Sequence, residues 1–274
     1  MNRISFMSAN YVARQLGYNM TQGWEQGDKA TNAHFEPLET FPERFEELLI
    51  QVRSLGFHAM DIWTGHLNWR WATPEHIAAA LGLLRQHGLS VSSLAGGFGS
   101  TPDEFESACR LAVALGTDIL GGITPLLERD RESVLCILRE YGVRLAVENH
   151  PERTPEDMLA KIGDGGGGII GTAVDTGWYA THGYNAPRAI EALGENILHV
   201  HLKDIRAPGG HDTCRYGEGI VPVEECVRAL QRLGYSGGIS VEHEPEDRDP
   251  SEDVAASLRM LRAWLGQNVD ASDK

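Results

Sequence analysis

The sequence predicts a single (β/α)8 TIM barrel, and three observations support this fold class. Short apolar runs alternate with amphipathic segments along the whole chain, as they do in repeated βα units. This alternation can be counted eight times. The length of 274 residues is close to the roughly 250 residues at which such barrels occur as one domain. We therefore expect one domain over residues 1–274, with a disordered tail over about the last eight residues.

The eight predicted strands are short runs rich in apolar and β-branched residues. They cover residues 4–9, 57–63, 89–94, 119–124, 144–149, 170–175, 197–203 and 238–242. A segment with the apolar period of a helix follows each strand. The predicted helices cover residues 42–55, 74–87, 102–115, 126–141, 155–162, 186–193, 222–233 and 251–265. One closed barrel accounts for all of these elements, and a doubly wound open sheet is the alternative.

Proline and glycine mark the boundaries of these elements. Thr-Pro pairs begin the helices at residues 74 and 155, because proline fits the first turn of a helix. Four helices end in Leu-Gly or His-Gly just before the next strand, where glycine readily adopts the conformation that closes a helix. The polar connection over residues 10–40 is longer than usual, and loops of this length often act as lids.

Composition limits the partners of this protein. Its formal charge of −15 would repel a nucleic-acid backbone, and its basic residues form no run. No stretch approaches the roughly 20 apolar residues of a membrane span. The four cysteines form no CxxC pair, and three lie in predicted helices, which favours reduced thiols. We expect a cytoplasmic protein that binds neither nucleic acid nor membrane, and a homo-oligomer is compatible with these features.

Four consecutive predicted strands end in side chains that ligate metals. These residues are Glu148, Asp175, His201 and Glu242. Catalytic groups of this barrel come from the carboxyl ends of its strands, and neighbouring strands lie about 4.8 Å apart, so the four side chains should converge. Three carboxylates would repel one another there, and a divalent cation relieves that repulsion. Oxygen ligands with one imidazole suit Mn²⁺, Mg²⁺ or Co²⁺, with Zn²⁺ also compatible.

The motifs around these residues resemble a known family. They read Val-Glu148-Asn-His, Val-Asp175-Thr-Gly, His-Val-His201-Leu-Lys-Asp and Ser-Val-Glu242-His-Glu. They are similar to motifs of the xylose isomerase-like TIM-barrel superfamily, in its sugar phosphate isomerase/epimerase group, which includes ketose 3-epimerases and inosose dehydratase. The resemblance covers essentially the whole chain. It implies that the four residues bind one metal ion, and that Glu148 and Glu242 also form an acid/base pair on opposite faces of the substrate.

The chemistry of the four residues agrees with those roles. A cation stabilises the charged enediolate that forms when a proton leaves the carbon beside a carbonyl group. Two carboxylates facing that carbon allow one to remove the proton and the other to return one. The sequence therefore predicts a metal-dependent isomerase or epimerase acting on a small sugar or polyol. The same two groups could instead assist the loss of water, so a dehydratase is the alternative enzyme.

Two further candidate substrate contacts lie beside the predicted ligands. His150 shares its side of the strand with Glu148, and a loop histidine in solvent is the alternative. Lys203 stands in the same relation to His201, where ketose epimerases resemble one another in carrying a substrate-binding polar group. An ion pair with Asp204 or another acid is the alternative for this lysine.

The remaining candidates lie in loops. Trp24 and His66 belong to two loops rich in aromatic residues, which pack well against the C–H faces of sugars, although they could equally cover the barrel rim or a subunit contact. Arg215 lies in a loop that contributes to the pocket in the family, and an ordinary surface arginine is the alternative. Trp178 stands where some ketose epimerases carry a histidine. This departure puts ketose 3-epimerase activity in doubt and does not affect the metal site.

Two other classes of protein, a nuclease and a non-catalytic sugar-binding protein, fit the sequence less well. A nuclease resembling endonuclease IV would need many histidine ligands and a surface for DNA, and the sequence offers one clear histidine ligand and a negative charge. A non-catalytic sugar-binding protein remains the alternative of a different class. The pair Glu148 and Glu242 argues against it, because binding alone does not require two opposed carboxylates.

Overall fold

Eight parallel strands close into a barrel in the computed structural model, which describes residues 2–267. The predicted tail lies outside the described residues. The strands are joined in chain order, and the last pairs with the first. They are β1 (Arg3–Met7), β2 (Ala59–Trp63), β3 (Ser90–Gly97), β4 (Ile119–Ile123), β5 (Arg144–Glu148), β6 (Ile170–Asp175), β7 (Ile197–Leu202) and β10 (Gly238–Val241). The predicted TIM barrel is confirmed.

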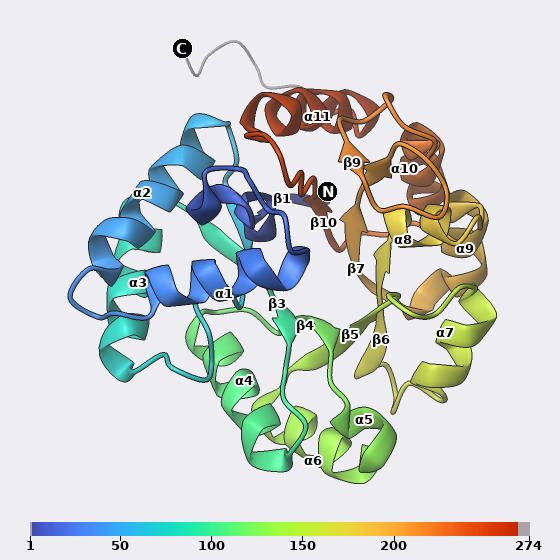
Figure 1. Ribbon diagram of the computed structural model, residues 1–274. Helices are drawn as coiled ribbons and strands as arrows, with labels where there is room; N and C mark the ends of the chain where they lie inside the picture. The colour runs from blue at the N-terminus through green and yellow to red at the C-terminus, as the bar shows by residue number, and fades with distance from the viewer. Residues whose placement is uncertain (1, 268–274) are drawn as a thin grey trace.

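Helices surround the strands in a ring (Figure 1). The long ones on the outside are α2 (Phe41–Ser54), α3 (Pro74–Gln86), α4 (Pro102–Ala114), α6 (Arg131–Tyr141), α7 (Pro155–Ile162), α9 (Ala186–Leu193), α10 (Val223–Arg232) and α11 (Ser251–Trp264). The Thr-Pro pairs begin helices as predicted. Thr73 and Thr154 each accept a hydrogen bond from the backbone of the third helical residue, so the first turn is capped.

Four connections differ from the prediction. The predicted helix over residues 126–141 is two helices, α5 (Leu126–Arg129) and α6, because Asp130 leaves helical geometry and caps α6 through Ser133. The long connection after β1 contains the helix α1 (Trp24–Phe35). The segment after β7 forms a small antiparallel hairpin of β8 (Asp204–Ile205) and β9 (Thr213–Cys214), and a short helix, α8 (Thr176–Thr181), directly follows β6.

The apolar core fills the layer between the barrel and its outer helices. Aromatic side chains are prominent in it, and the rings of Phe41 and Phe45 on α2 stack with centroids 5.1 Å apart. The inside of the barrel is different, because it holds a buried polar group that includes Asp61, His199 and Ser240. The core therefore holds the helices to the barrel, while polar side chains occupy the barrel axis below its mouth.

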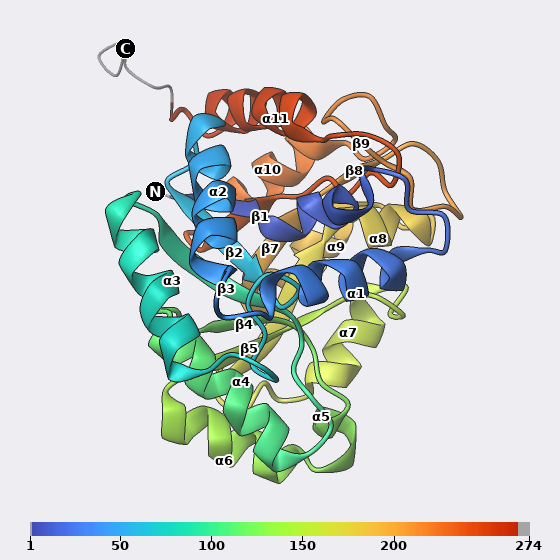
Figure 2. The ribbon, with the colours of Figure 1, turned by 60° about the vertical axis from the view of Figure 1, so that its left-hand side comes forward.

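The connections that follow the strands gather at one end of the barrel. Figure 2 shows α1 on the same side of the barrel as α8 and the β8–β9 hairpin, and all three border one cavity through Trp24, Trp178 and Thr213. No described helix combines the length and apolar composition needed to cross a lipid bilayer. The four cysteines are free thiols.

Candidate metal centre and active site

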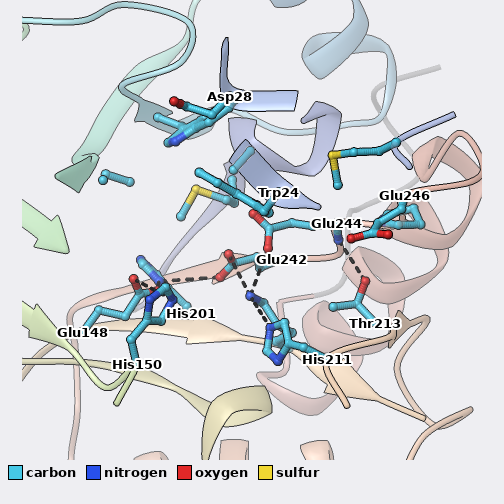
Figure 3. Close-up of a pocket in the computed structure, with 18 of the residues that line it drawn as sticks. Trp24, Asp28, Glu148, His150, His201, His211, Thr213, Glu242, Glu244 and Glu246 are labelled. Carbon is cyan, nitrogen blue, oxygen red and sulfur yellow. Dashed lines mark hydrogen bonds and ion pairs between the residues drawn. The ribbon is translucent and has the colours of Figure 1, made fainter. Parts of the chain in front are cut away.

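The four predicted ligands come together at the barrel mouth. Glu148, Asp175, His201 and Glu242 each offer a ligand atom, and these atoms all lie within 4.8 Å of one another. Each side chain stands at or just past the end of its strand, so the barrel itself brings them together. Figure 3 shows Glu148 and His201 side by side at one wall of a cavity, with Glu242 close to them. The convergence expected from the strand ends is present.

The donor atoms fit a divalent cation. Glu242 Oε2 is buried and accepts no hydrogen bond, and Asp175 Oδ2 is buried 3.0 Å from the Lys203 ammonium group. His201 Nδ1 donates to Glu148 Oε1 and lies 3.5 Å from Glu242 Oε2. Buried carboxylate oxygens without donors are costly unless a cation compensates them. Three carboxylates and one imidazole form an oxygen-rich donor set, which suits Mg²⁺ or Mn²⁺ and is also compatible with Zn²⁺.

The electrostatics of the site reflect this crowding of negative charge. Burial would lower the pKa of His201, but the carboxylates of Glu148 and Glu242 raise it to about 10. Burial raises the pKa of Glu242 to about 8, against the opposing effect of Lys203. Burial would also raise the pKa of Glu148, but His201 and His150 hold it well below its usual range. Negative charge is thus concentrated at this point of the barrel mouth, and a bound divalent cation would offset it.

Lys203 is the buried counter-charge of the cluster. Its side chain is 2% exposed, and Nζ lies 3.0 Å from Asp175 Oδ2 and 3.1 Å from Glu242 Oε1. A third carboxylate, Glu244, lies 3.1 Å from the same ammonium group. Burial opposes its charge, but these acids raise the pKa of Lys203 well above the ordinary value. The lysine thus pairs with acids other than Asp204, which instead accepts hydrogen bonds from the backbone of Gly217, Gly219 and Val221.

The cavity above the cluster has a volume of about 1000 Å³, at the upper end of the range for small-molecule sites. Trp24 of α1 borders it, 42% exposed, and its ring meets Trp63 edge-on at 5.0 Å. Figure 3 places Trp24 across the cavity from Glu148 and His150. The cavity therefore has groups that could bind a metal ion at its floor and an aromatic side chain on its far wall.

A stack of aromatic rings forms the wall beside Lys203. The rings of Trp178 and His211 lie 3.9 Å apart and almost parallel, and His150 meets Trp178 edge-on at 4.6 Å. His211 Nε2 lies 3.2 Å from Lys203 Nζ. His150 Nε2 lies 3.7 Å from Glu148 Oε2, and its side chain is open to the cavity. Both His150 and Trp178 are therefore placed where a substrate could touch them.

The structure does not bring His66 and Arg215 to this cavity. His66 is buried against Phe35 and Trp63. Arg215 forms an ion pair with Glu218 beside α11, in a separate surface hollow. Neither residue lines the cavity over the cluster. For His66 the alternative holds, because the residue is part of the aromatic cover of the barrel rim. Arg215 is an ordinary surface arginine.

The burial of His66 leads to a prediction about stability. Burial lowers the pKa of His66 to about 3, whereas an unfolded histidine titrates near pH 6.5. Its contribution to stability is complete above pH 6.5 and decreases as the pH falls towards 3. We expect His66→Gln to remove about 2–3 kcal/mol of the stability lost between pH 7 and pH 4. Urea unfolding at both pH values measures this, and an unchanged loss would contradict it.

Three residues of the site were missed in the sequence. Glu244 lies two residues after Glu242, and this spacing could have indicated that both face the mouth. His211 lies in an irregular segment without periodicity, so no pattern pointed to it. Asp61 is buried inside the barrel, where its Oδ2 is 2.7 Å from His199 Nε2. Among the described residues, Asp61, His199 and His201 form a second group compatible with a cation.

Comparisons with known proteins agree with the barrel fold. Residues 49–264 match the protein family described as xylose isomerase-like TIM barrel. An uncharacterized protein of Methanocaldococcus jannaschii, MJ1311, is 30% identical over 142 residues, 48% of this chain and 46% of that protein. L-ribulose-5-phosphate 3-epimerase UlaE of Escherichia coli is 36% identical over 70 residues, 26% of this chain and 23% of the enzyme. The chain thus spans less than half the length of these curated relatives.

A solved structure of L-ribulose 3-epimerase has the same architecture. It superposes with a TM-score of 0.70 and covers 97% of this chain and 95% of its own, at 16% sequence identity. At this identity the likeness establishes the fold alone. A part of the chain is thus similar in sequence to one sugar epimerase, and the side chains at the barrel mouth must identify the chemistry.

Proposed function

Because the chain belongs to the xylose isomerase-like TIM barrel family, we propose that it is a divalent-metal-dependent isomerase or epimerase of a sugar or keto-polyol. The observation that carries this proposal is the cluster of Glu148, Asp175, His201 and Glu242 at the floor of an open cavity. Two of its carboxylates border the cavity, so they are available to a substrate as well as to a metal ion.

The four residues of the cluster would hold one divalent ion. Such an ion supplies positive charge that stabilises the enediolate formed when a carbon beside a carbonyl group loses its proton. Asp175 is fully buried and does not border the cavity, so its role is to hold charge at the floor. His201 keeps Nδ1 directed at Glu148 and Glu242, which leaves both glutamates oriented towards the same point.

Glu148 and Glu242 are the proposed acid/base pair. They approach from β5 and from the end of β10, so a substrate between them would meet one carboxylate on each side. Both side chains border the cavity, so one carboxyl group can remove a proton from a bound substrate while the other returns one. Epimerisation needs both groups, because the proton leaves one face and returns to the other.

The surrounding side chains would bind the hydroxyl groups and the carbon skeleton. Lys203 borders the cavity, and its ammonium group, paired with Asp175, Glu242 and Glu244, would hold these carboxylates beside a bound substrate. His150 offers a ring nitrogen beside Glu148, and Trp24 and Trp178 offer aromatic faces to C–H groups. The formal charge of −15 favours neutral substrates over phosphorylated ones.

Proton exchange with solvent tests this proposal. The protein would be incubated in D2O with Mg²⁺ and a panel of ketoses, aldoses and inososes, and the products followed by NMR. We expect deuterium at a carbon next to the carbonyl group, and no exchange after the metal has been chelated. The labelled carbon identifies the reaction, and an alkene carbon with loss of water would instead identify a dehydratase. Binding without exchange for every substrate, in metal-loaded protein, would favour a sugar-binding protein.

A further inference from the structure

A buried polar group lies inside the barrel next to the metal cluster. Asp61 on β2 and His199 on β7 are hydrogen-bonded, with 2.7 Å between Oδ2 and Nε2, and Ser240 on β10 donates to the same carboxylate oxygen. Ser5 lies 3.0 Å from Ser240, so the network crosses to β1. All four side chains are essentially inaccessible to solvent. His201 stands on the same strand as His199, two residues later, and therefore on the same side of it.

Three atoms bordering this group have no hydrogen-bond partner. They are Asp61 Oδ1, Ser93 Oγ and His201 Nε2, and each is buried. Asp61, His199 and His201 each bring a side-chain atom within 4.8 Å of the others. Unpaired buried polar atoms are costly, so a set of them gathered in one place calls for a shared partner.

Gly121 on β4 leaves the room for that partner. A Cβ atom added at this position would lie 3.5 Å from Ser93 Oγ and 3.6 Å from His201 Nε2, which is ordinary contact. The space beside Gly121 thus admits a methyl group or a water molecule, and two of the unpaired atoms, Ser93 Oγ and His201 Nε2, border it. A buried water is stable where two to four polar atoms surround it.

With a metal ion bound, His201 Nε2 would be a hydrogen-bond donor and Asp61 Oδ1 an acceptor, so the two atoms would complement each other. His201 faces the cluster with Nδ1, so a neutral imidazole that binds a cation there carries its proton on Nε2. That N–H group needs an acceptor, and Asp61 Oδ1 needs a donor. Partners of this kind fix the tautomer and orientation of a ligating histidine.

We propose that Asp61 is a positioning residue for the metal centre, connected to His201 Nε2 through one water molecule beside Gly121. The water accepts the hydrogen bond from His201 and donates to Asp61 Oδ1, while Ser93 lies at its side. His199 and Ser240 hold Asp61 in place from the opposite direction. This inference rests on the proposed function, because it requires a metal ion on His201 Nδ1.

Two variants test the connection with Zn²⁺ as a diamagnetic probe. Gly121→Ala fills the space of the water and changes no polar side chain. Asp61→Asn keeps the shape but turns one acceptor into a donor. We expect both to lower Zn²⁺ affinity 10- to 100-fold by calorimetry. NMR of the histidine rings should detect a slowly exchanging Nε2 proton on His201 in the native protein, and both variants should lose or shift this signal.

A control variant and the number of Zn²⁺ ions bound per chain distinguish failure of this inference from failure of the proposed function. Gly82→Ala on α3, where an added Cβ meets nothing within 4 Å, should bind Zn²⁺ as the native protein does. If Asp61→Asn fails to fold, Gly121→Ala still tests the connection between Asp61 and His201. Native affinity and an unchanged ring signal in Gly121→Ala would overturn the inference and leave the metal centre intact. Two ions per chain would put a cation on Asp61 and His199 and also overturn it, and no bound ion in the native protein would reject the proposed function as well.

Discussion

The variant Glu242→Gln is expected to lose proton exchange by about 10²- to 10⁴-fold, the contribution typical of an acid/base group. Glutamine has nearly the same shape and keeps an oxygen that can ligate a metal, but it cannot carry the proton. Glu242 borders the cavity, where the carboxyl group of the native side chain can exchange a proton with a bound substrate. Deuterium incorporation from D2O, followed by NMR, measures the loss.

The metal content of the variant must be determined in the same sample, because a lost ion would also stop the reaction. Glu195→Gln serves as the matched control, since Glu195 is exposed at the start of β7, away from the cavity. It should exchange at the native rate. Native exchange in metal-loaded Glu242→Gln would show that Glu242 is not part of the acid/base pair.

Asp175→Asn is expected to weaken Mn²⁺ binding by about 100-fold or more, because residues that only support a ligand already change affinity 10- to 100-fold. Asp175 is fully buried, and its Oδ2 lies 3.0 Å from Lys203 Nζ. The asparagine can still accept the hydrogen bond that Oδ1 takes from the backbone of Trp178. The change therefore removes a charge from the floor of the cavity while keeping the local cap of α8. Titration calorimetry measures the affinity.

Asp118→Asn is the control for charge removal. Asp118 is 58% exposed in an ion pair with Arg144, so its replacement should leave Mn²⁺ affinity unchanged. Equal Mn²⁺ affinity of Asp175→Asn and the native protein would mean that Asp175 is not a ligand. The role of Asp175 would then be limited to its ion pair with Lys203.

The barrel and the metal cluster were predictable because both depend on strand periodicity. A strand end is fixed by where an apolar run stops, and parallel strands in a closed barrel bring their carboxyl ends together. Asp175 is the last residue of β6, as predicted, and Glu148 is the last residue of β5, one position before the predicted end of that strand. His201 could be identified in the same way, because it occupies the end of the run that forms β7.

Helix α1 was not predictable from its own residues. It carries a weak apolar stripe of Gly27, Thr31 and Phe35. Gly27 is needed for close packing, because a Cβ there would lie 2.5 Å from the backbone oxygen of Val12. A helix that buries glycine and threonine has little of the usual apolar signature. The helix is held by contacts with other segments, such as the hydrogen bonds of Asn32 with Asn68 and Trp71. The residues of the helix alone do not reveal these contacts.

The partners of Lys203 also depended on tertiary structure. The neighbouring Asp204 suggested an ion pair, but adjacent residues of a strand point to opposite sides. Lys203 therefore turns to the barrel mouth, where Asp175 and Glu242 lie. Glu244, its third partner, comes from the connection after β10. A sequence indicates which side a residue faces more reliably than which distant side chain it meets there.

The location of a bound metal ion tests the central claim most directly. Crystals soaked in Mn²⁺ would be measured at a wavelength where manganese scatters anomalously. We expect one strong peak among Glu148, Asp175, His201 and Glu242, about 2.0–2.3 Å from the four ligand atoms. A peak bound instead by Asp61 and His199, or the absence of any peak at the barrel mouth, would contradict the four-residue metal centre and the proton-transfer chemistry built on it.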